Sequence, residues 1–293
     1  MRRRALAGLV ILALVAAVTA ALAGCPKKAA VKPKPPVFLV KKVTKANHAD
    51  VPEASFNVLV LGSDTLGGSG GGRSDAIMLV HVSPKQRSMT FLSFPRDSYV
   101  DIPGAGRRKI NEAYSSGGPE RAVETIERLT GLTIDYYAVT TFVGFWHLID
   151  GMGWVYVDVD RSFTDKDAGV TVTQGRTQMS GQMALGYARA RHAVPNGDFG
   201  RARHQQDILV GLYKQERPRG IARMLFTLPI VYDNIETDLP FDEAFSLASA
   251  VLRVDPEKVR QEVAPGGTGS VGGASVVLLN MSQLSEIAAG MRD

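Results

Sequence analysis

Apolar runs typical of strands alternate with amphipathic segments typical of helices along most of this 293-residue chain. Strands are expected at residues 55–62, 76–83, 88–95, 136–141, 154–159 and 275–279. Helices are expected at residues 119–129, 142–149, 180–189, 201–215, 221–232 (interrupted at Pro229), 241–253 and 282–291. The short link between the second and third strands predicts an antiparallel hairpin. This order predicts an α/β fold, a three-layer α/β/α domain on a central mixed sheet, as one domain over 53–293.

The charge of the chain is unevenly distributed. Residues 1–45 contain ten basic and no acidic residues, which leaves 24 basic and 29 acidic residues in the rest. The body is therefore mildly acidic, which argues against a general nucleic-acid surface, so we expect no nucleic-acid partner. Any anion site must then be a local cluster of arginine and lysine.

The N-terminal segment is typical of a secreted, anchored protein. Residues 1–24 combine a basic start with an apolar run, as in a signal peptide, and the run ends in Leu22-Ala23-Gly24-Cys25. That ending resembles a bacterial lipobox, which would attach lipid to Cys25; an uncleaved membrane helix is the alternative. The Pro- and Lys-rich residues 25–52 resemble a tether. We expect an extracytoplasmic body anchored to the outer face of the bacterial cell membrane through lipidated Cys25.

Two aspartates frame a glycine-rich stretch between the first two predicted strands. Asp64 precedes it, and Arg73-Ser74-Asp75 follows it. Mg²⁺ takes carboxylate oxygens together with phosphate oxygens, so Asp64 and Asp75 are candidate metal ligands. Taken alone, the same residues are better explained as a solvated loop with acids at the strand ends.

Cationic residues cluster in three further places. Arg96-Asp97 follows the third strand, and residues 107–111 form a short basic run that includes Lys109. The densest group contains four arginines within fifteen residues: Arg189, Arg191, Arg201 and Arg203. Two further polar residues, Asp198 and Gln205, lie among or next to them. In an extended segment Arg189 and Arg191 would share one face. Guanidinium groups match phosphate geometry, so the group predicts an anion site, although any single arginine could form a surface ion pair.

Several strings taken together resemble the LytR–CpsA–Psr family. They are GSD…GRSD, SFPRDSYVDIP, KINEAYSSGGPE, IDYYAVTTFVGFWHLIDGMGWVYVDV, GQMALGYARARH and GDFGRARHQQ, in order over residues 56–215. The resemblance implies a glycopolymer–peptidoglycan phosphotransferase. Such an enzyme moves a glycopolymer from a polyprenyl-pyrophosphate carrier to the peptidoglycan acceptor with the help of Mg²⁺. Most family members carry an N-terminal transmembrane helix, and this chain departs from them with its lipobox.

The resemblance also implies roles for individual residues. The implied metal pair is Asp64 and Asp75. The implied pyrophosphate-binding residues are Arg73, Arg96, Lys109, Arg189, Arg191, Asp198, Arg201 and Gln205. The implied catalytic residues are Asp75, Arg96 and Asp97, and the general base stays open between Asp75 and Asp97. His204 stands where the family usually has arginine, with Arg203 one position early, so that role is not carried over.

The prenyl tail requires an apolar channel, which we expect between the sheet and helices such as 119–129 and 142–149. Apolar stripes on such helices more often form ordinary core, and that alternative stays open. Two other functions remain open at this point. Water could replace the acceptor, which would make the protein a polyprenyl-pyrophosphate phosphohydrolase. Alternatively, the protein could be a lipid-anchored module that binds wall polymer without catalysis. A simple sugar binder, however, has no need of paired aspartates beside arginines.

Overall fold

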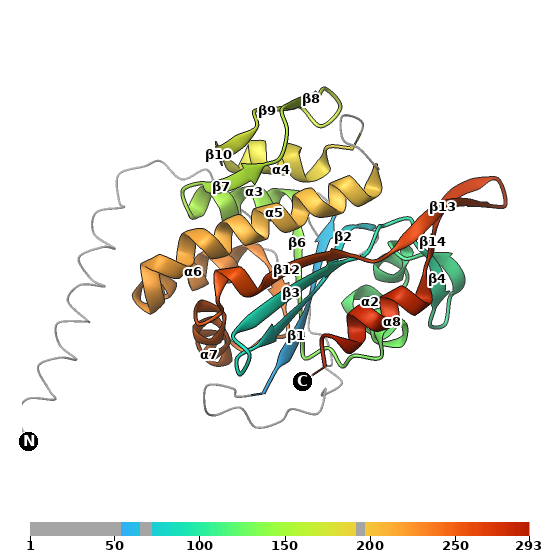
Figure 1. Ribbon diagram of the computed structural model, residues 1–293, viewed down its shortest axis with the longest axis horizontal. Helices are drawn as coiled ribbons and strands as arrows, with labels where there is room; N and C mark the ends of the chain where they lie inside the picture. The colour runs from blue at the N-terminus through green and yellow to red at the C-terminus, as the bar shows by residue number, and fades with distance from the viewer. Residues whose placement is uncertain (1–53, 65–71, 192–196, 293) are drawn as a thin grey trace, which may run out of the picture. The chain divides into compact units, whose positions relative to one another are not determined.

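A six-stranded mixed sheet forms the centre of the molecule. The computed structural model describes residues 54–64, 72–191 and 197–292, and Figure 1 shows their arrangement. The strand order is β11 (Glu236–Thr237), β6 (Tyr136–Thr141), β1 (Phe56–Ser63), β2 (Ser74–Ser83), β3 (Ser88–Ser93) and β12 (Val259–Val263). β1 runs parallel to β6 and antiparallel to β2, while β3 runs antiparallel to β2 and parallel to β12. The carboxyl ends of β1, β3, β6 and β12 therefore lie at one edge of the sheet.

Alternate side chains of the sheet enter two separate cores, because successive residues of a strand point to opposite faces. Leu59 and Leu79 pack in the core that α2 (Glu112–Thr130) and α8 (Met281–Ala289) complete. Phe56 and Met78 pack in the core completed by α5 (Asp198–Glu216) and α7 (Phe241–Leu252). Helices thus cover both faces, which confirms the predicted three-layer α/β/α fold with a central mixed sheet.

A third core lies on the side of α5 that faces away from the sheet (Figure 1). Its elements are α3 (Phe142–Gly151), β7 (Val155–Val159), β8 (Phe163–Asp165), β9 (Val170–Val172), β10 (Gly175–Met179) and α4 (Gly181–Arg189). α5 approaches β7 so closely that a Cβ on Gly211 would lie 2.3 Å from the carbonyl oxygen of Tyr156. The expected strand at 154–159 therefore belongs to this layer, paired with β10, and not to the main sheet.

Two hairpins and α6 complete the described residues. The hairpins are β4 (Tyr99–Ile102) with β5 (Gly106–Lys109), and β13 (Gly266–Val271) with β14 (Ala274–Leu279). α6 (Gly220–Asn234) continues through Pro229, so the predicted interruption is wrong. Pro229 is exposed, so water can hydrate the carbonyl that this proline leaves without a partner.

The expected helix at 119–129 begins earlier than predicted. α2 starts at Glu112 and is kinked at Gly117 and Gly118, the latter with φ of +71°. No helix among the described residues is long and apolar enough to span a bilayer. The expected signal peptide at 1–24, the tether at 25–52 and Cys25 lie outside the described residues.

Candidate active site

The sheet edge that carries the carboxyl ends of β1, β3 and β6 gathers the predicted charged residues. Asp75 is the second residue of β2, and Arg96 follows the end of β3. Arg96 Nη1 lies 2.6 Å from Asp75 Oδ1, so the two motifs meet as an ion pair. Burial alone would lower the pKa of Arg96, but the hydrogen bond and charge of Asp75 raise it above its ordinary value. Ligands of open α/β sheets bind beyond this kind of edge.

The N-terminus of α5 brings a second ion-pair group to the same edge. Asp198 is the first residue of the helix, where a carboxylate is favoured by the helix dipole. Its Oδ1 lies 3.1 Å from Arg201 Nη2 and 3.3 Å from Arg191 Nε. The Arg201 side chain is only 8% exposed. Burial lowers the pKa of Arg201, Asp198 opposes this, and the nearby Arg96 adds to the lowering.

The β4–β5 hairpin brings Lys109, the last residue of β5, back to Asp97. The Ile110 N–H donates to the Ser98 carbonyl at 2.8 Å, and Lys109 Nζ lies 3.1 Å from Asp97 Oδ1. Burial opposes ionisation of Asp97, but the ion pair with Lys109, the hydrogen bond with Asp198 and the charge of Arg96 outweigh it, so the pKa of Asp97 is lowered. Asp97 is therefore a carboxylate at neutral pH.

An apolar cavity of about 270 Å³ opens beside this cluster. Its walls come from β1, β2 and β6 of the sheet and from α3, α4 and α5. The apolar lining includes Val60, Met78, Phe142, Phe145, Leu148, Leu185, Ile208, Leu209 and Ile235. Seven polar side chains also line it: Asp75, Arg96, Thr140, Thr141, Arg189, Arg201 and Gln205. The cavity lies beside α3, the expected helix 142–149, and not beside helix 119–129, because α2 packs on the other face of the sheet. That it receives a prenyl tail stays a prediction.

The polar part of the cavity is short of negative charge. The charged side chains in its lining are three arginines, Arg96, Arg189 and Arg201, and one carboxylate, Asp75. Arg96 Nε is buried without a hydrogen-bond acceptor among the described residues. Unsatisfied buried donors cost free energy that an added anion would recover. The cavity is therefore suited to an amphiphile with an anionic head and an apolar tail.

Arg189 and Arg191 turn away from each other. Arg189 ends α4, lines the cavity and has its guanidinium carbon 5.0 Å from the centre of the Phe142 ring. Arg191 instead lines a second pocket of about 560 Å³ together with Asp97, Asp198 and the β13–β14 hairpin. The expectation of one shared face is wrong because α4 ends between the two residues. Asp198 connects the two pockets through its ion pairs with Arg191 and Arg201.

The predicted metal ligands lie at the ends of two neighbouring strands: Asp64 directly follows β1, and Asp75 is the second residue of β2. Asp64 Oδ1 accepts a hydrogen bond from the Arg73 N–H at 2.8 Å, and the Arg73 side chain is exposed and lines neither pocket. The described residues hold no group of three or more histidine, cysteine or acidic side chains placed to bind a metal. Mg²⁺ commonly uses only one or two carboxylates plus phosphate oxygens, so this donor set is compatible with it.

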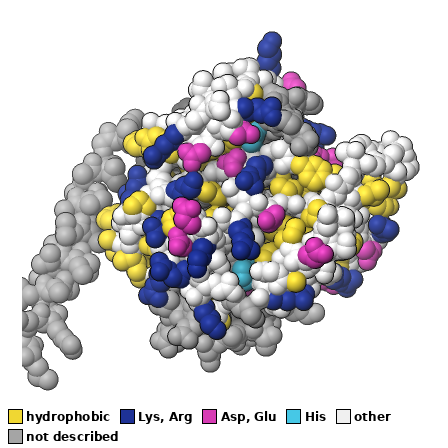
Figure 2. Space-filling view, in the orientation of Figure 1, with side chains coloured by type: hydrophobic (Ala, Val, Ile, Leu, Met, Phe, Trp, Pro, Cys, Tyr) yellow, Lys and Arg dark blue, Asp and Glu magenta, His cyan; other side chains and the backbone are white. Residues whose placement is uncertain are grey.

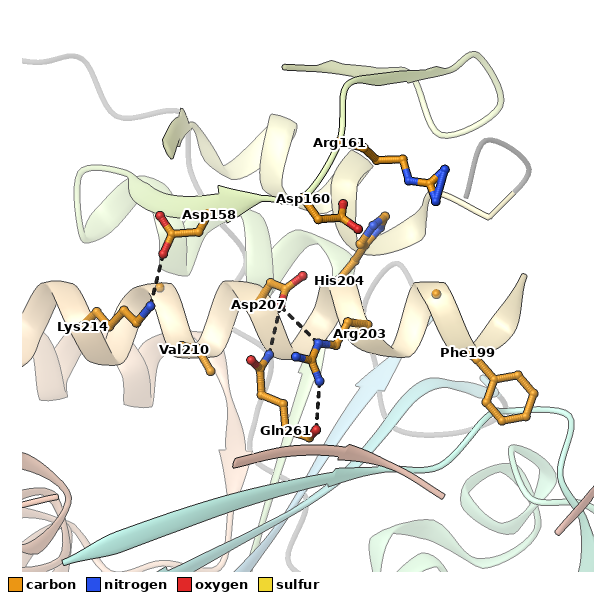
Figure 3. A pocket seen from close by; sticks show the side chains of 12 residues that line it. Asp158, Asp160, Arg161, Phe199, Arg203, His204, Asp207, Val210, Lys214 and Gln261 are labelled. Carbon is orange, nitrogen blue, oxygen red and sulfur yellow. Dashed lines mark hydrogen bonds and ion pairs between the residues drawn. The ribbon is translucent and has the colours of Figure 1, made fainter. Parts of the chain in front are cut away.

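Arg203 and His204 lie on another face of α5, in a pocket of about 570 Å³ (Figure 3). Arg203 Nη1 donates to the Gln261 carbonyl, and Asp207 accepts from Gln261 Nε2. His204 stacks on Phe163 and on Tyr187, with ring centres 5.4 and 4.0 Å apart, and burial lowers its pKa. Neither residue reaches the cavity, which agrees with leaving the family's arginine role unassigned here.

Three residues in or beside the site were not predicted. The buried Ser74 Oγ and Asn111 Oδ1 have no hydrogen-bond partner among the described residues, and Ser74 N–H donates to the Asn111 carbonyl. Ser74 and Asn111 belong to the GRSD and KIN strings, next to residues that were predicted. Their place in these strings is the sequence signal that could have identified them. No sequence signal indicated Phe142, whose ring lies against the Arg189 guanidinium group, because an apolar residue at the start of a helix is ordinary.

Comparison with known proteins agrees with this architecture. The profile of the LytR_cpsA_psr family matches residues 26–293. The chain is 32% identical over 244 residues to the polyisoprenyl-teichoic acid–peptidoglycan teichoic acid transferase TagU of Enterococcus faecalis, covering 81% of this chain and 79% of TagU. It is 37% identical over 202 residues to the regulatory protein MsrR of Staphylococcus aureus, covering 68% of this chain and 61% of MsrR.

Solved structures show the same fold. TagV of B. subtilis superposes with a TM-score of 0.72 at 29% identity, covering 82% of this chain and 98% of TagV. TagT bound to LI-WTA superposes with a TM-score of 0.69 at 26% identity, covering 85% of this chain and 94% of TagT. The chain thus belongs to the LytR_cpsA_psr family.

Proposed function

We propose that this chain is a phosphotransferase that moves a glycopolymer from a polyprenyl-pyrophosphate carrier to peptidoglycan. The observation that carries the proposal is the cavity, which combines an apolar wall with Arg96, Arg189 and Arg201. A prenyl tail fits the apolar wall, and a diphosphate fits the guanidinium groups. Related proteins named as teichoic acid transferases to peptidoglycan support the same acceptor.

The reaction follows from the charges. An acceptor hydroxyl of peptidoglycan attacks the phosphorus nearest the glycan, the bond from that phosphorus to the bridging oxygen breaks, and polyprenyl phosphate leaves. The product is a phosphodiester between glycopolymer and peptidoglycan. Negative charge spreads over the phosphoryl oxygens in the transition state, so the arginines act by positioning and neutralisation. Asp75 and Asp97 are the carboxylates that can accept the proton of the acceptor hydroxyl.

The two pockets give the substrate a direction. With its tail in the cavity, the diphosphate lies beside Arg201 and Asp198, and the glycan continues into the pocket lined by Arg191 and Asp97. The same pocket leaves room for the acceptor. Asp64 and Asp75 would hold Mg²⁺, which supplies further neutralisation of phosphate oxygens when bound. Lipidated Cys25 would keep the body at the outer membrane face, where this substrate is presented.

A direct test supplies a labelled glycan on polyprenyl pyrophosphate, with and without peptidoglycan. We expect label to become covalently linked to peptidoglycan through a phosphodiester, and Arg96→Ala to abolish this. Arg107→Ala is the matched control, because Arg107 is exposed on β5 and contacts the Tyr99 ring. Release of glycan phosphate without attachment would show the hydrolase instead, and retention of activity in Arg96→Ala would contradict the proposed site.

A further inference from the structure

One face of α6 is apolar and faces solvent. The residues exposed along the first ten positions of the helix are Ile221, Ala222, Leu225, Phe226 and Pro229, and we call these five the α6 surface. Their spacing places them on one side of a helix. Leu225 is 65% and Phe226 is 66% exposed, more than any other large apolar side chain among the described residues. Contiguous exposure of this kind marks an interaction site.

The chain that leads into α6 and forms its first turns carries an excess of positive charge. Residues 217–232 contain Arg217, Arg219 and Arg223 and no acidic residue. Glu216 pairs with Arg219 at 2.6 Å and with Arg223 at 3.7 Å, which leaves an excess of positive charge at the start of the helix. In Figure 2 hydrophobic side chains appear beside Lys and Arg at the left margin of the described body, over α6. The acidic residues lie toward the other end of the helix, where Asp233 is near its last turn and Asp242 and Glu243 of α7 act on Tyr232.

This combination matches a bilayer surface that contains acidic phospholipids. Apolar side chains of an interfacial helix enter the boundary between headgroups and acyl chains, while its arginines contact phosphates. A purely apolar protein partner would leave the arginines without anions. The charge complementarity therefore favours an acidic membrane as the occupant.

The same helix is joined to the wall of the apolar cavity. Ile235, directly after α6, lines the cavity, and Thr140 Oγ1, also in the lining, donates to the Asn234 carbonyl at 3.1 Å. α3, another wall, packs so closely that a Cβ on Gly151 would lie 2.7 Å from Ile230 Cγ2. A membrane bound at α6 would thus lie next to the elements that enclose the cavity.

We propose that the α6 surface binds the acidic lipid bilayer and holds the cavity next to the lipid phase from which a prenyl substrate enters. The binding itself stands on exposure and charge, whereas the role in substrate entry rests on the proposed function.

Lipid contact can be measured on the full chain reconstituted in vesicles. In a Cys25→Ser background, Leu225→Cys carries an environment-sensitive fluorophore. Met281→Cys on α8 is the control, because Met281 is 49% exposed and lines neither pocket of the site. We expect nitroxide-labelled lipids to quench the Leu225 site and not the Met281 site, and only in vesicles that contain phosphatidylglycerol. Equal quenching at both sites, or none at Leu225, would overturn the proposal. So would shielding of the Leu225 site without lipid together with self-association in sedimentation.

The link to substrate entry needs a second readout. For Leu225→Glu/Phe226→Glu we expect KM for a long-chain donor in vesicles to rise by about tenfold, because burial of two apolar side chains is lost. This variant should use a short-chain donor in free solution normally. The control Met281→Glu/Ser285→Glu, which adds the same charge on the exposed face of α8, should use both donors normally. Impairment with both donors would overturn the entry role. An inactive wild-type protein would refute the proposed function, while the quenching result would still decide membrane binding.

Discussion

Arg201 and Arg203 show how the surroundings of a residue decide its role. They are two positions apart on α5, yet Arg201 is buried against Asp198 at the cavity, while Arg203 is half exposed beside Asp207 and Gln261. A helix turns by about 100° per residue, so neighbouring arginines serve different faces. Only Arg201 adds charge where phosphate would lie.

Conservative replacement separates these two roles. Arg201→Lys keeps the charge but loses the planar fork that matches phosphate. We expect kcat/KM for glycopolymer transfer to fall by about tenfold or more, with the fold retained by circular dichroism. Arg203→Lys should transfer at the wild-type rate. A larger loss in Arg203→Lys than in Arg201→Lys would contradict the assignment.

His204 makes stability depend on pH. Its pKa is lowered in the folded protein by burial, which outweighs the hydrogen bond to the Tyr187 carbonyl and the nearby Asp160. As pH falls, the unfolded chain therefore takes up this proton at a higher pH than the folded chain does. The free energy of unfolding consequently falls as pH drops below about 6.5. His204→Phe preserves the stacking and removes the titration. Urea unfolding between pH 7 and 5 should show a smaller fall in the variant, and equal slopes would refute the argument.

At the scale of elements, local signals predicted most of the large units. The alternating apolar runs predicted β1, β2 and β3, and the Pro119-to-Gly131 pattern predicted the main part of α2. The short strands of the third core were missed, because three-residue strands such as β8 carry too few residues for a period to show. Their pairing depends on packing against α5, which is remote in sequence.

The candidate site was predictable to a similar degree. The strings identified Asp75, Arg96, Arg201 and Gln205, which the fold brings to one cavity. The separation of Arg189 from Arg191 was not predictable, because it depends on where α4 ends. The contact between Lys109 and Asp97 depends on the β4–β5 hairpin, whose basic strand β5 lacks an apolar pattern.

Close packing of α5 on β7 can be tested at one glycine. A Cβ at Gly211 would meet a backbone oxygen, which cannot move aside cheaply. We expect Gly211→Ala to lower the free energy of unfolding by about 1–3 kcal/mol. Gly267→Ala is the control, since nothing lies within 4 Å of a Cβ there. Denaturant titrations compare the two, and equal stability of both variants would contradict this packing.

The cavity between the helices and the sheet should determine the use of lipid tails. Leu185 of α4 is part of its lining. Leu185→Trp would occupy space that a prenyl chain requires, so we expect KM for long-chain donors to rise by about tenfold, as loss of buried apolar contact implies. Short-chain donors should be affected less. If chain length made no difference, the tail would not lie in this cavity.

At the scale of the whole molecule, the described body is arranged around the diphosphate position. The apolar cavity lies to one side, between the sheet and α3, α4 and α5, and the pocket over the β13–β14 hairpin lies to the other. Asp198 is shared between them through Arg201 and Arg191. This arrangement assigns the lipid to one side and the sugars to the other, and the α6 surface lies next to the lipid side.

The most direct test is a crystal structure of the protein with a polyprenyl diphosphate bound. We predict that the tail lies between the sheet and α3, α4 and α5, with the diphosphate oxygens in contact with Arg96, Arg189 and Arg201. A diphosphate bound away from these arginines, or a tail that lies outside the cavity, would contradict the account.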